Sequence, residues 1–504
     1  MRRAERKAIG TAFLIQFATC YLLAAVPMLY MEIAMGQFTS ASPWLAFEMI
    51  SPAMAGIPAA LGFNIVLRIV ASSVWITHAL ALFGISLTGI IMKLPWADCM
   101  DMFGCYDVRL ADRCTFASPN DTFCADFIES LVMDRSSYTK DTPLVSYLQS
   151  LLKEDHPMSS ENFIPHPLLV VALLMVWLIA NVAQNGGAYL LGNTSFIVIP
   201  VAVISLFMTV TTAIAVGDIA GSLHHYYQHR FNKLLEVKDW IVAAGHAVFI
   251  LNVSTGGMIK LASSRPFHLP ILRDVIIIAV VTLLFHAVTL LSTTAIIDGY
   301  AARVYPYDTH DERFGYVTER RYLVMATVGE AFVGMTGGWI LSALYFLGIA
   351  VVPLQKLATE LWVVVSMLRE KYNEAFQEHL NQRQLNIVTS LIVIFGFLVN
   401  LPFIMSGGFS RSQLILKATL QNTLAIGFLQ LVTVAYIYGF RRFTVNIRAM
   451  VGGYGPVNFF WWFNWTVISP FVHLLLFQPR SDWGPSKSTD RMETTIKERA
   501  LRVR

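Results

Sequence analysis

Residues 274–301 read DVIIIAVVTLLFHAVTLLSTTAIIDGYA, and this stretch decides the class of fold to which the chain belongs. Between Asp274 and Asp298 it carries no Asp, Glu, Lys or Arg. A run of about 20 apolar residues has the length of a helix that spans the roughly 30 Å hydrocarbon core of a bilayer. Lipid offers no hydrogen-bonding partner to the backbone, so such a run must be helical. We therefore expect a transmembrane helix here.

Other runs of this kind occur along the chain, and its composition agrees with them. Hydrophobic residues make up 55% of the 504 positions and charged residues only 14%, with a mean hydropathy of +0.56. A soluble chain with so few charges could not cover its surface. We expect an all-α transmembrane protein with about ten helices, of which the longest is tilted or extends beyond the membrane. The other runs lie at 11–35, 58–92, 168–184, 191–216, 240–261, 338–368, 385–405, 413–439 and 456–477.

Four of the five cysteines gather in one polar segment. They are Cys99, Cys105, Cys114 and Cys124. The same segment contains the sequence N-D-T at residues 120–122, an acceptor for N-glycosylation at Asn120. Disulfides and glycans are typical of the extracellular side of a membrane. We therefore predict a large extracellular loop at 97–166. Zinc binding by the four cysteines is an alternative, but they contain no C-x-x-C pair.

The charges in the loops predict the orientation of the helices. If the loop at 97–166 is outside, three basic loops fall on the opposite side, as expected for cytoplasmic loops. Their basic residues are Arg265 and Arg273, then Arg369, Lys371 and Arg383, then Arg441, Arg442 and Arg448. The same alternation gives an extracellular loop at 302–337 and a polar C-terminal tail at 478–504. We interpret residues 1–504 as one membrane-embedded domain, located in the plasma membrane.

The two ends of the chain break this rule. The alternation places the basic segment 2–7 and the basic tail 480–504 on the exterior. One additional spanning helix at each end would return both segments to the cytoplasmic side. We therefore expect one spanning helix to be missing at each end.

Several motifs carry a family resemblance in the correct order along nearly the whole chain. GTAFLIQF at 10–17 and VPMLYMEIAMGQFTS at 26–40 resemble the second helix of the neurotransmitter:sodium symporters, and LPWADC at 94–99 resembles their outer-loop signature. WIVAAGHAVFILNVSTGGMIKLASS at 240–264 resembles the sixth helix, while YIYGFRRF at 436–443 and WTVISP at 465–470 resemble the tenth and eleventh. The resemblance implies an inverted-repeat fold with a substrate site at the midplane, between broken first and sixth helices. It also favours a Cys99–Cys105 disulfide, although four cysteines permit three connectivities.

The resemblance places the substrate site at the break in the sixth helix. Asn252, Ser254 and Thr255 suit an unwound segment that lines a polar cavity, because a regular helix would expose them to lipid. Polar contacts between helices, or close packing at 256–257, are the alternatives. The family's pattern adds pocket residues in the sixth and third helices. These are Phe249, Val70 and Val74.

Residues outside the pocket are assigned by the same resemblance for Glu32, and by their unusual place inside apolar runs for His246 and Arg68. Glu32, one helical turn before Gly36, corresponds to a carboxylate that hydrogen-bonds near the broken helix. A purely structural role for Glu32 is the alternative. His246 is a coupling residue or a neutral hydrogen-bonding residue. Arg68 either neutralises a substrate carboxylate or a neighbour's charge, or lies near the cytoplasmic end with its head extended toward water.

Sodium and chloride are implied by the resemblance, but their ligand positions have changed. The sodium positions are occupied by Ile250, Pro353 and Leu354, whose side chains contain no oxygen. A hard cation prefers oxygen ligands. The chloride positions carry Phe17 and His246. Sodium coupling is therefore in doubt, and we identify no metal ligands in this chain.

The sequence predicts a secondary active transporter of small organic solutes, such as an amine, an amino acid or an osmolyte. It contains no phosphate-binding loop, nucleotide fingerprint or catalytic arrangement, so we expect neither an enzyme nor a nucleic-acid-binding protein. The expected partners are a small-molecule substrate and membrane lipid, with homo- or hetero-oligomers left open. The alternatives are a transport-inactive family member that binds or traffics another membrane protein, and a truncated gene model.

Overall fold

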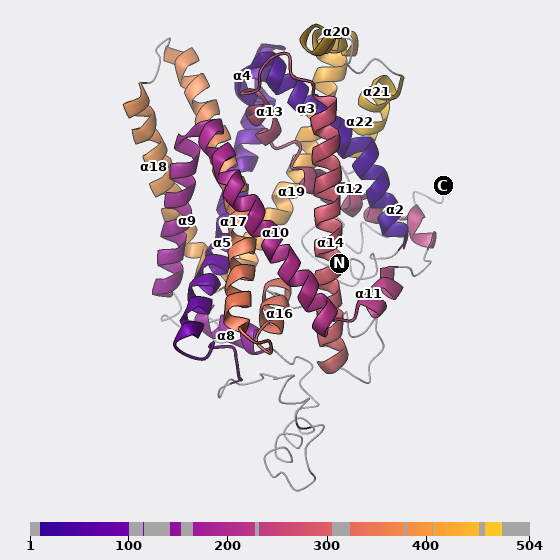
Figure 1. Ribbon diagram of the computed structural model, residues 1–504. Helices are drawn as coiled ribbons and strands as arrows, with labels where there is room; N and C mark the ends of the chain where they lie inside the picture. The colour runs from indigo at the N-terminus through magenta and orange to yellow at the C-terminus, as the bar shows by residue number, and fades with distance from the viewer. Residues whose placement is uncertain are drawn as a thin grey trace, which may run out of the picture.

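The computed structural model describes residues 11–99, 114, 142–152, 165–226, 231–304, 323–376, 381–405, 407–452 and 459–475. Within these ranges the regular elements are all helical, and most of them run roughly side by side along one direction (Figure 1). The predicted all-α class is therefore confirmed for the described chain.

Eight segments of the described chain are long and apolar enough to cross a membrane. They are Thr11–Thr39 (α2, Thr11–Cys20; η1, Tyr21–Ala25; α3, Val26–Thr39), Pro52–Ile90 (mainly α5, Gly56–Leu87), Pro167–Asn185 (α9), Gly187–Val216 (α10), Leu272–Arg303 (α14, Leu272–Val304), Gly338–Asn373 (α17, Gly338–Phe376), Arg383–Phe403 (α18, Gln382–Asn400) and Gly408–Val451 (α19, Gly408–Val432; η8, Thr433–Gly439; α20, Phe440–Val451). Each coincides with a run that the sequence predicts.

The two other predicted runs are described over shorter helical stretches. The run at 240–261 is divided into α12 (Val237–Leu251) and α13 (Gly257–Ala262), and neither half alone is long enough to span a bilayer. The last run comprises α21 (Phe459–Phe463), η10 (Asn464–Ile468) and α22 (Ser469–Leu475). The count of ten membrane helices stays a prediction, since length and composition establish eight among the described residues.

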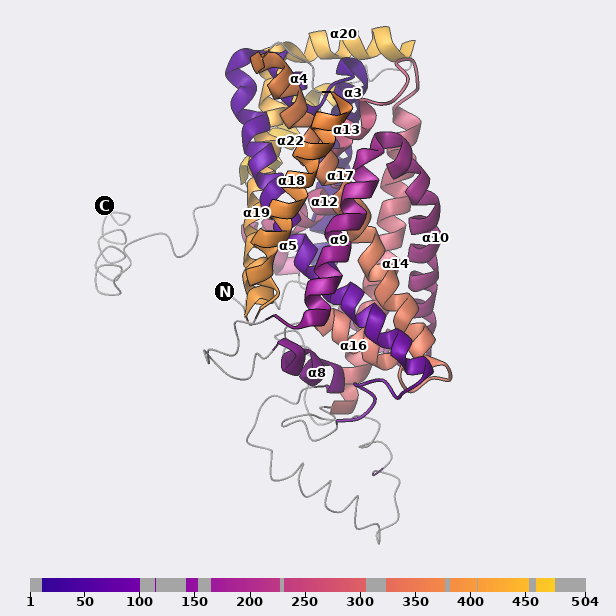
Figure 2. The same cartoon turned by 90° about the vertical axis from the view of Figure 1, so that its left-hand side faces the viewer.

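The outer faces of several helices are apolar, as lipid requires. On α10 the side chain of Phe196 is 81% exposed, and on α18 that of Phe395 is 68% exposed. Large exposed apolar surfaces of this kind are rare on soluble monomers. Towards the inside, α5 packs along α17 and α19, and α10 packs along α17 and α14 (Figure 2).

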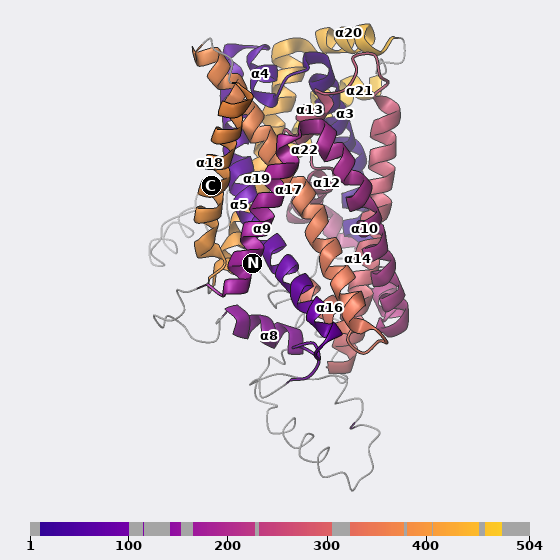
Figure 3. The same cartoon turned by 60° about the vertical axis from the view of Figure 1, so that its left-hand side comes forward.

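The basic segments meet at one end of the helix bundle. There the turn after α13 touches α20, because His268 Nδ1 lies 3.0 Å from the carbonyl oxygen of Met450. Glu370 at the end of α17 accepts a hydrogen bond of 2.8 Å from the backbone nitrogen of Ser42, next to α4 (Pro43–Glu48). α8 (Pro143–Leu152) and α16 (Leu323–Ala331) lie at the opposite end, while α20 lies crosswise over the basic end (Figure 3). The basic segments therefore share one end, as the charge pattern predicts.

Pro27 interrupts the hydrogen bonding of the first helical run. Proline has no backbone N–H, so the carbonyl of Leu23, four residues earlier, loses its usual donor. Two side chains of the last run replace it, with Asn464 Nδ2 at 2.7 Å and Ser469 Oγ at 3.1 Å from the Leu23 oxygen. The Leu23 carbonyl therefore joins the first and the last described helical runs by hydrogen bonds.

Candidate functional site

The candidate site is the break between α12 and α13. Its backbone turns through left-handed conformations at Asn252 (φ 52°), Ser254 (φ 60°) and Gly256 (φ 73°). Residues with a Cβ seldom adopt such angles, so the surrounding structure must hold them there. The break leaves the last carbonyls of α12 and the first N–H groups of α13 without their helical partners. The predicted unwound segment is therefore present where the sequence places it.

Glu32, on the neighbouring helix α3, stabilises the break by a hydrogen bond. Its side chain is fully buried, and Oε1 accepts a hydrogen bond of 2.9 Å from the backbone nitrogen of Ser254. An N–H that the helix cannot satisfy thus receives a carboxyl partner. Glu32 therefore touches the broken helix, as the family resemblance implies.

Gly36 allows α3 and α13 to approach each other at backbone distance. A Cβ added there would lie 2.1 Å from the carbonyl oxygen of Ile259. No side chain fits in that space, so the contact requires glycine. One turn separates Gly36 from Glu32, and the two residues fix α3 against α13 and against the break that precedes it.

Several buried polar atoms around the break have no protein partner among the described residues. They are Glu32 Oε2, Asn252 Oδ1, Ser254 Oγ, Gln430 Nε2 and Oε1, and His473 Nε2. Ser254 Oγ lies against Gly427 of α19, and the ring of His473 lies against the same glycine. Buried polar groups normally find partners. This end of the site therefore has free hydrogen-bonding capacity for a polar solute.

Thr255 and Asn252 stabilise the shape of the break itself. Thr255 Oγ1 donates a hydrogen bond of 2.8 Å to the carbonyl oxygen of Asn252. Thr255 is 3% exposed. Its hydroxyl is used within the turn, whereas Ser254 Oγ and Asn252 Oδ1 have no partner among the described residues.

Phe249 lies about one turn before the break, and a lysine of α17, Lys356, lies over its ring. Its side chain is 43% exposed, and the Nζ atom of Lys356 lies 4.5 Å from the centre of its ring. That distance is within the range of a cation–π interaction. The sequence reasoning missed Lys356, although a lysine in the middle of the apolar run at 338–368 was a visible signal.

Arg68 is buried and paired with an acidic residue of α17. Its Nη2 atom lies 2.8 Å from Oε1 of Glu360, and the side chains are only 6% and 2% exposed. The prediction that the arginine head extends to water is therefore wrong, and neutralisation of a neighbour's charge is correct. Glu360 follows Lys356 by four residues, so both lie on one face of α17.

Val70 and Val74 lie on α5, with Val74 fully buried and Val70 half-buried. α5 touches the break at Leu61, whose side chain lies against Gly256. The two valines follow Leu61 by about two and a half and three and a half turns. Their place in a substrate pocket stays a prediction.

His246 lies on α12 one turn before Phe249. The centre of its ring is 6.3 Å from the centre of the Phe13 ring. A coupling role for His246 stays a prediction.

The positions that the family resemblance assigns to sodium do not fit a cation in this structure. Ile250 packs against the apolar core, and Pro353 lies inside α17. Leu354 is 9% exposed and belongs to the same core. These side chains supply no oxygen, and no group of three or more His, Cys, Asp and Glu residues forms a metal site among the described residues.

The extracellular assignments lie mostly beyond the described chain. Cys99 and Cys114 are both disulfide-bonded. Cys105 and Asn120 are outside the described residues, so the Cys99–Cys105 pairing and the glycosylation remain predictions. Cys20 is buried and free, as expected for a small residue inside an apolar helix.

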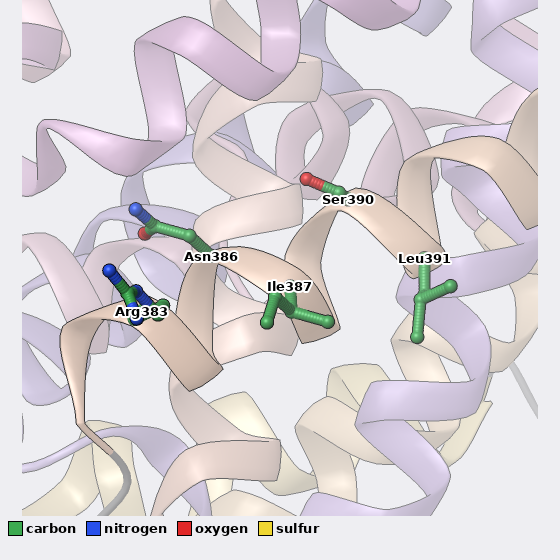
Figure 4. A pocket seen from close by; sticks show the side chains of 5 residues that line it. All are labelled: Arg383, Asn386, Ile387, Ser390 and Leu391. Atoms are coloured by element: carbon green, nitrogen blue, oxygen red, sulfur yellow. The ribbon is translucent and has the colours of Figure 1, made fainter.

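An open hollow on the outside of α18 is unrelated to this site (Figure 4). All five lining residues come from that helix, and their spacing of three or four residues places them on one face. They are Arg383, Asn386, Ile387, Ser390 and Leu391. A surface made by one helix does not enclose a solute, so the break remains the candidate site.

Comparisons with known proteins agree with the geometry. The model of the sodium:neurotransmitter symporter family matches residues 5–481. The sodium- and chloride-dependent glycine transporter 2 of Xenopus laevis is 23% identical over 92% of this chain and 59% of its own length. The sodium-dependent acetylcholine transporter of Caenorhabditis elegans is 23% identical over 93% and 65%. The sodium-dependent nutrient amino acid transporter 1 of Drosophila grimshawi is 23% identical over 93% and 70%. The chain thus spans less than two thirds of the length of the first two relatives.

Proposed function

Because this chain belongs to the sodium:neurotransmitter symporter family, we propose that it is a secondary active transporter that carries a small organic solute across a membrane. The observation that carries the proposal is the break between α12 and α13, which Glu32 holds open through the backbone of Ser254. The relatives are transporters by name, and they do not favour the alternative of a transport-inactive binding partner.

In this proposal the solute binds at the break by polar contacts to one side and apolar contacts to the other. Ser254 Oγ and Asn252 Oδ1 supply hydrogen bonds, and Phe249 supplies an apolar face. Discontinuous helices of this kind bind substrates in transporters that alternate between inward-open and outward-open forms. Movement of the surrounding helices around the fixed break would expose the solute to each side in turn.

We propose further that any coupling ion does not use the family's sodium positions through side chains. Ile250, Pro353 and Leu354 offer no oxygen ligand. These residues therefore favour an exchange of solutes that does not require sodium. We also propose that this multi-pass membrane protein resides in the plasma membrane, which surface biotinylation of the expressed chain would test.

The proposal is tested by uptake measurements in cells that express the chain at their surface. Radiolabelled glycine, proline, choline and a mixture of amino acids are offered with sodium and with sodium replaced by N-methylglucamine. We expect accumulation of at least one solute above untransfected cells, with at most a twofold change on sodium removal. Absence of uptake across this panel in protein detected at the surface would contradict transport, and strict sodium dependence would contradict the ion proposal alone.

A further inference from the structure

Among the described residues, Lys356 carries a charge at an unexpected depth. It lies close to the middle of the 39-residue helix α17, about 27 Å from the first residue of that helix at 1.5 Å per residue. A lysine side chain is too short to bring its ammonium group from this depth to the lipid headgroups. An ammonium group in the centre of a membrane is costly, and ionisable residues at that depth mark functional sites.

Glu360, the acidic residue near Lys356, is already paired. It makes the 2.8 Å contact with Arg68. Lys356 interacts with Glu360 and Arg68 only as a charge at longer range. Within the described part of the chain its ammonium group makes no hydrogen bond and no ion pair within 4 Å.

The ammonium group instead lies over the ring of Phe249, the aromatic residue at the candidate substrate site. This ring face is the surface on which a cationic substrate would be bound by cation–π attraction. Lys356 occupies it from within the protein. The three N–H donors of the ammonium are left for a partner that enters the site, and the best partner for an ammonium in low dielectric is a carboxylate.

We infer that Lys356 is the residue that selects the substrate, pairing with the carboxylate of an organic acid or amino acid and excluding simple amines. This inference rests on the proposed transport function and narrows its three solute classes to those that carry a carboxylate. A simple amine would meet the positive charge of Lys356 at the ring that should receive it. A carboxylate would neutralise that charge within the membrane.

A structural role for Lys356 is the competing explanation, in which the contact with Phe249 only joins α17 to α12. The two roles differ in what they predict for solutes of different charge. A structural contact affects all solutes equally, whereas an ion pair affects only those with a carboxylate.

The experiment compares solutes that differ only in the carboxylate. The pairs are glycine with methylamine, γ-aminobutyrate with butylamine, and phenylalanine with phenethylamine, each radiolabelled. Uptake is measured for the unmodified chain, Lys356→Gln and Lys356→Arg. Lys371→Gln is the matched control, because Lys371 also lies over an aromatic ring, 5.1 Å from that of Trp44, at the end of the bundle away from the break.

We expect uptake of at least one carboxylate and at least tenfold less of its paired amine. Lys356→Gln should lower carboxylate uptake at least tenfold, Lys356→Arg should restore part of it, and Lys371→Gln should change it by less than twofold. Equal uptake of a carboxylate and its paired amine, or unchanged carboxylate uptake in Lys356→Gln, would overturn the inference while transport itself stands.

A binding measurement separates the inference from transport. The thermal melting temperature of each purified variant is recorded with millimolar concentrations of the same solutes. If no solute is taken up, stabilisation by a carboxylate that is lost in Lys356→Gln still supports the inference. If no solute raises the melting temperature of the unmodified chain more than that of Lys356→Gln, the inference is wrong, whether or not the chain transports a solute. The melting temperatures without solute also show whether each variant is folded.

Discussion

Pro27 and Asn464 lie in the first and last described helical runs, and their relation shows how single side chains hold this fold together. Proline deprives the Leu23 carbonyl of its helical donor, and the Asn464 amide replaces that donor at 2.7 Å. Asn464 is completely buried, so the hydrogen bond forms where water cannot compete. The same logic applies at Glu32, which satisfies the Ser254 N–H at the break. At this scale the chain repairs an interrupted helix with a side chain from another helix.

Substitution of Asn464 by alanine tests this repair. We expect a loss of about 1–3 kcal/mol in the free energy of unfolding, because the buried Leu23 carbonyl loses its best donor. In a Pro27→Ala background residue 27 regains its backbone N–H, and the same substitution should cost much less. Thermal unfolding of the four proteins in detergent forms a double-mutant cycle that measures this coupling. Equal costs in the two backgrounds would show that Asn464 does not act through the Leu23 carbonyl.

At the scale of elements, the site depends on how closely α3 approaches the divided helix. Gly36 lies directly against the backbone of α13, and Glu32 on the same helix reaches Ser254. The apolar runs themselves were predictable, because their length is dictated by the thickness of the bilayer. The close packing of α3 and α13 was not, because it depends on a contact between residues that are distant in sequence. Glycine at 36 was visible in the motif, but its neighbour was not.

We expect Gly36→Ala to displace α13 and to abolish uptake, because the added Cβ would meet the Ile259 carbonyl at 2.1 Å. Backbone cannot move aside as a flexible side chain can. Gly84→Ala in α5 is the matched control, since a Cβ there meets nothing within 4 Å. Alanine is the better helix former by about 1 kcal/mol, so this control should melt at the same temperature or higher. Uptake and melting temperature are measured for both, and a fully active Gly36→Ala would contradict the close packing.

At the scale of the whole molecule, the basic segments gather at one end, while Trp96 packs against Tyr147 of α8 at the other end. Contacts between distant segments create the basic end. Gln37 Nε2 donates to the carbonyls of Phe267 and Leu269 at 2.9 Å, and Arg265 Nε donates to Gln37 Oε1 at 3.0 Å. A membrane protein with this distribution should place the basic end in the cytoplasm.

Cysteine labelling tests this orientation. Ala449→Cys places an exposed thiol on α20 at the basic end, and Ile91→Cys places one beyond the other end of α5. We expect a membrane-impermeant maleimide to label Ile91→Cys in intact cells and Ala449→Cys only after permeabilisation. Cys20 is buried, and Cys99 and Cys114 are in disulfides. The labelling of the unmodified chain, which includes any reaction of Cys105 and Cys124, is subtracted as background. Labelling of Ala449→Cys in intact cells would reverse the assigned orientation.

The sequence by itself determined that residues 274–301 and the other apolar runs are helices, because a bilayer imposes both length and internal hydrogen bonding. The family resemblance placed the break at 252–256, where Asn252, Ser254 and Thr255 suit an unwound segment. Only the tertiary structure decided which charges are paired and which are free. Arg68 finds Glu360, while Lys356 lies over Phe249 instead. Pairing depends on distances of a few ångströms between separate helices, and those distances are set by packing rather than by the order of residues along the chain.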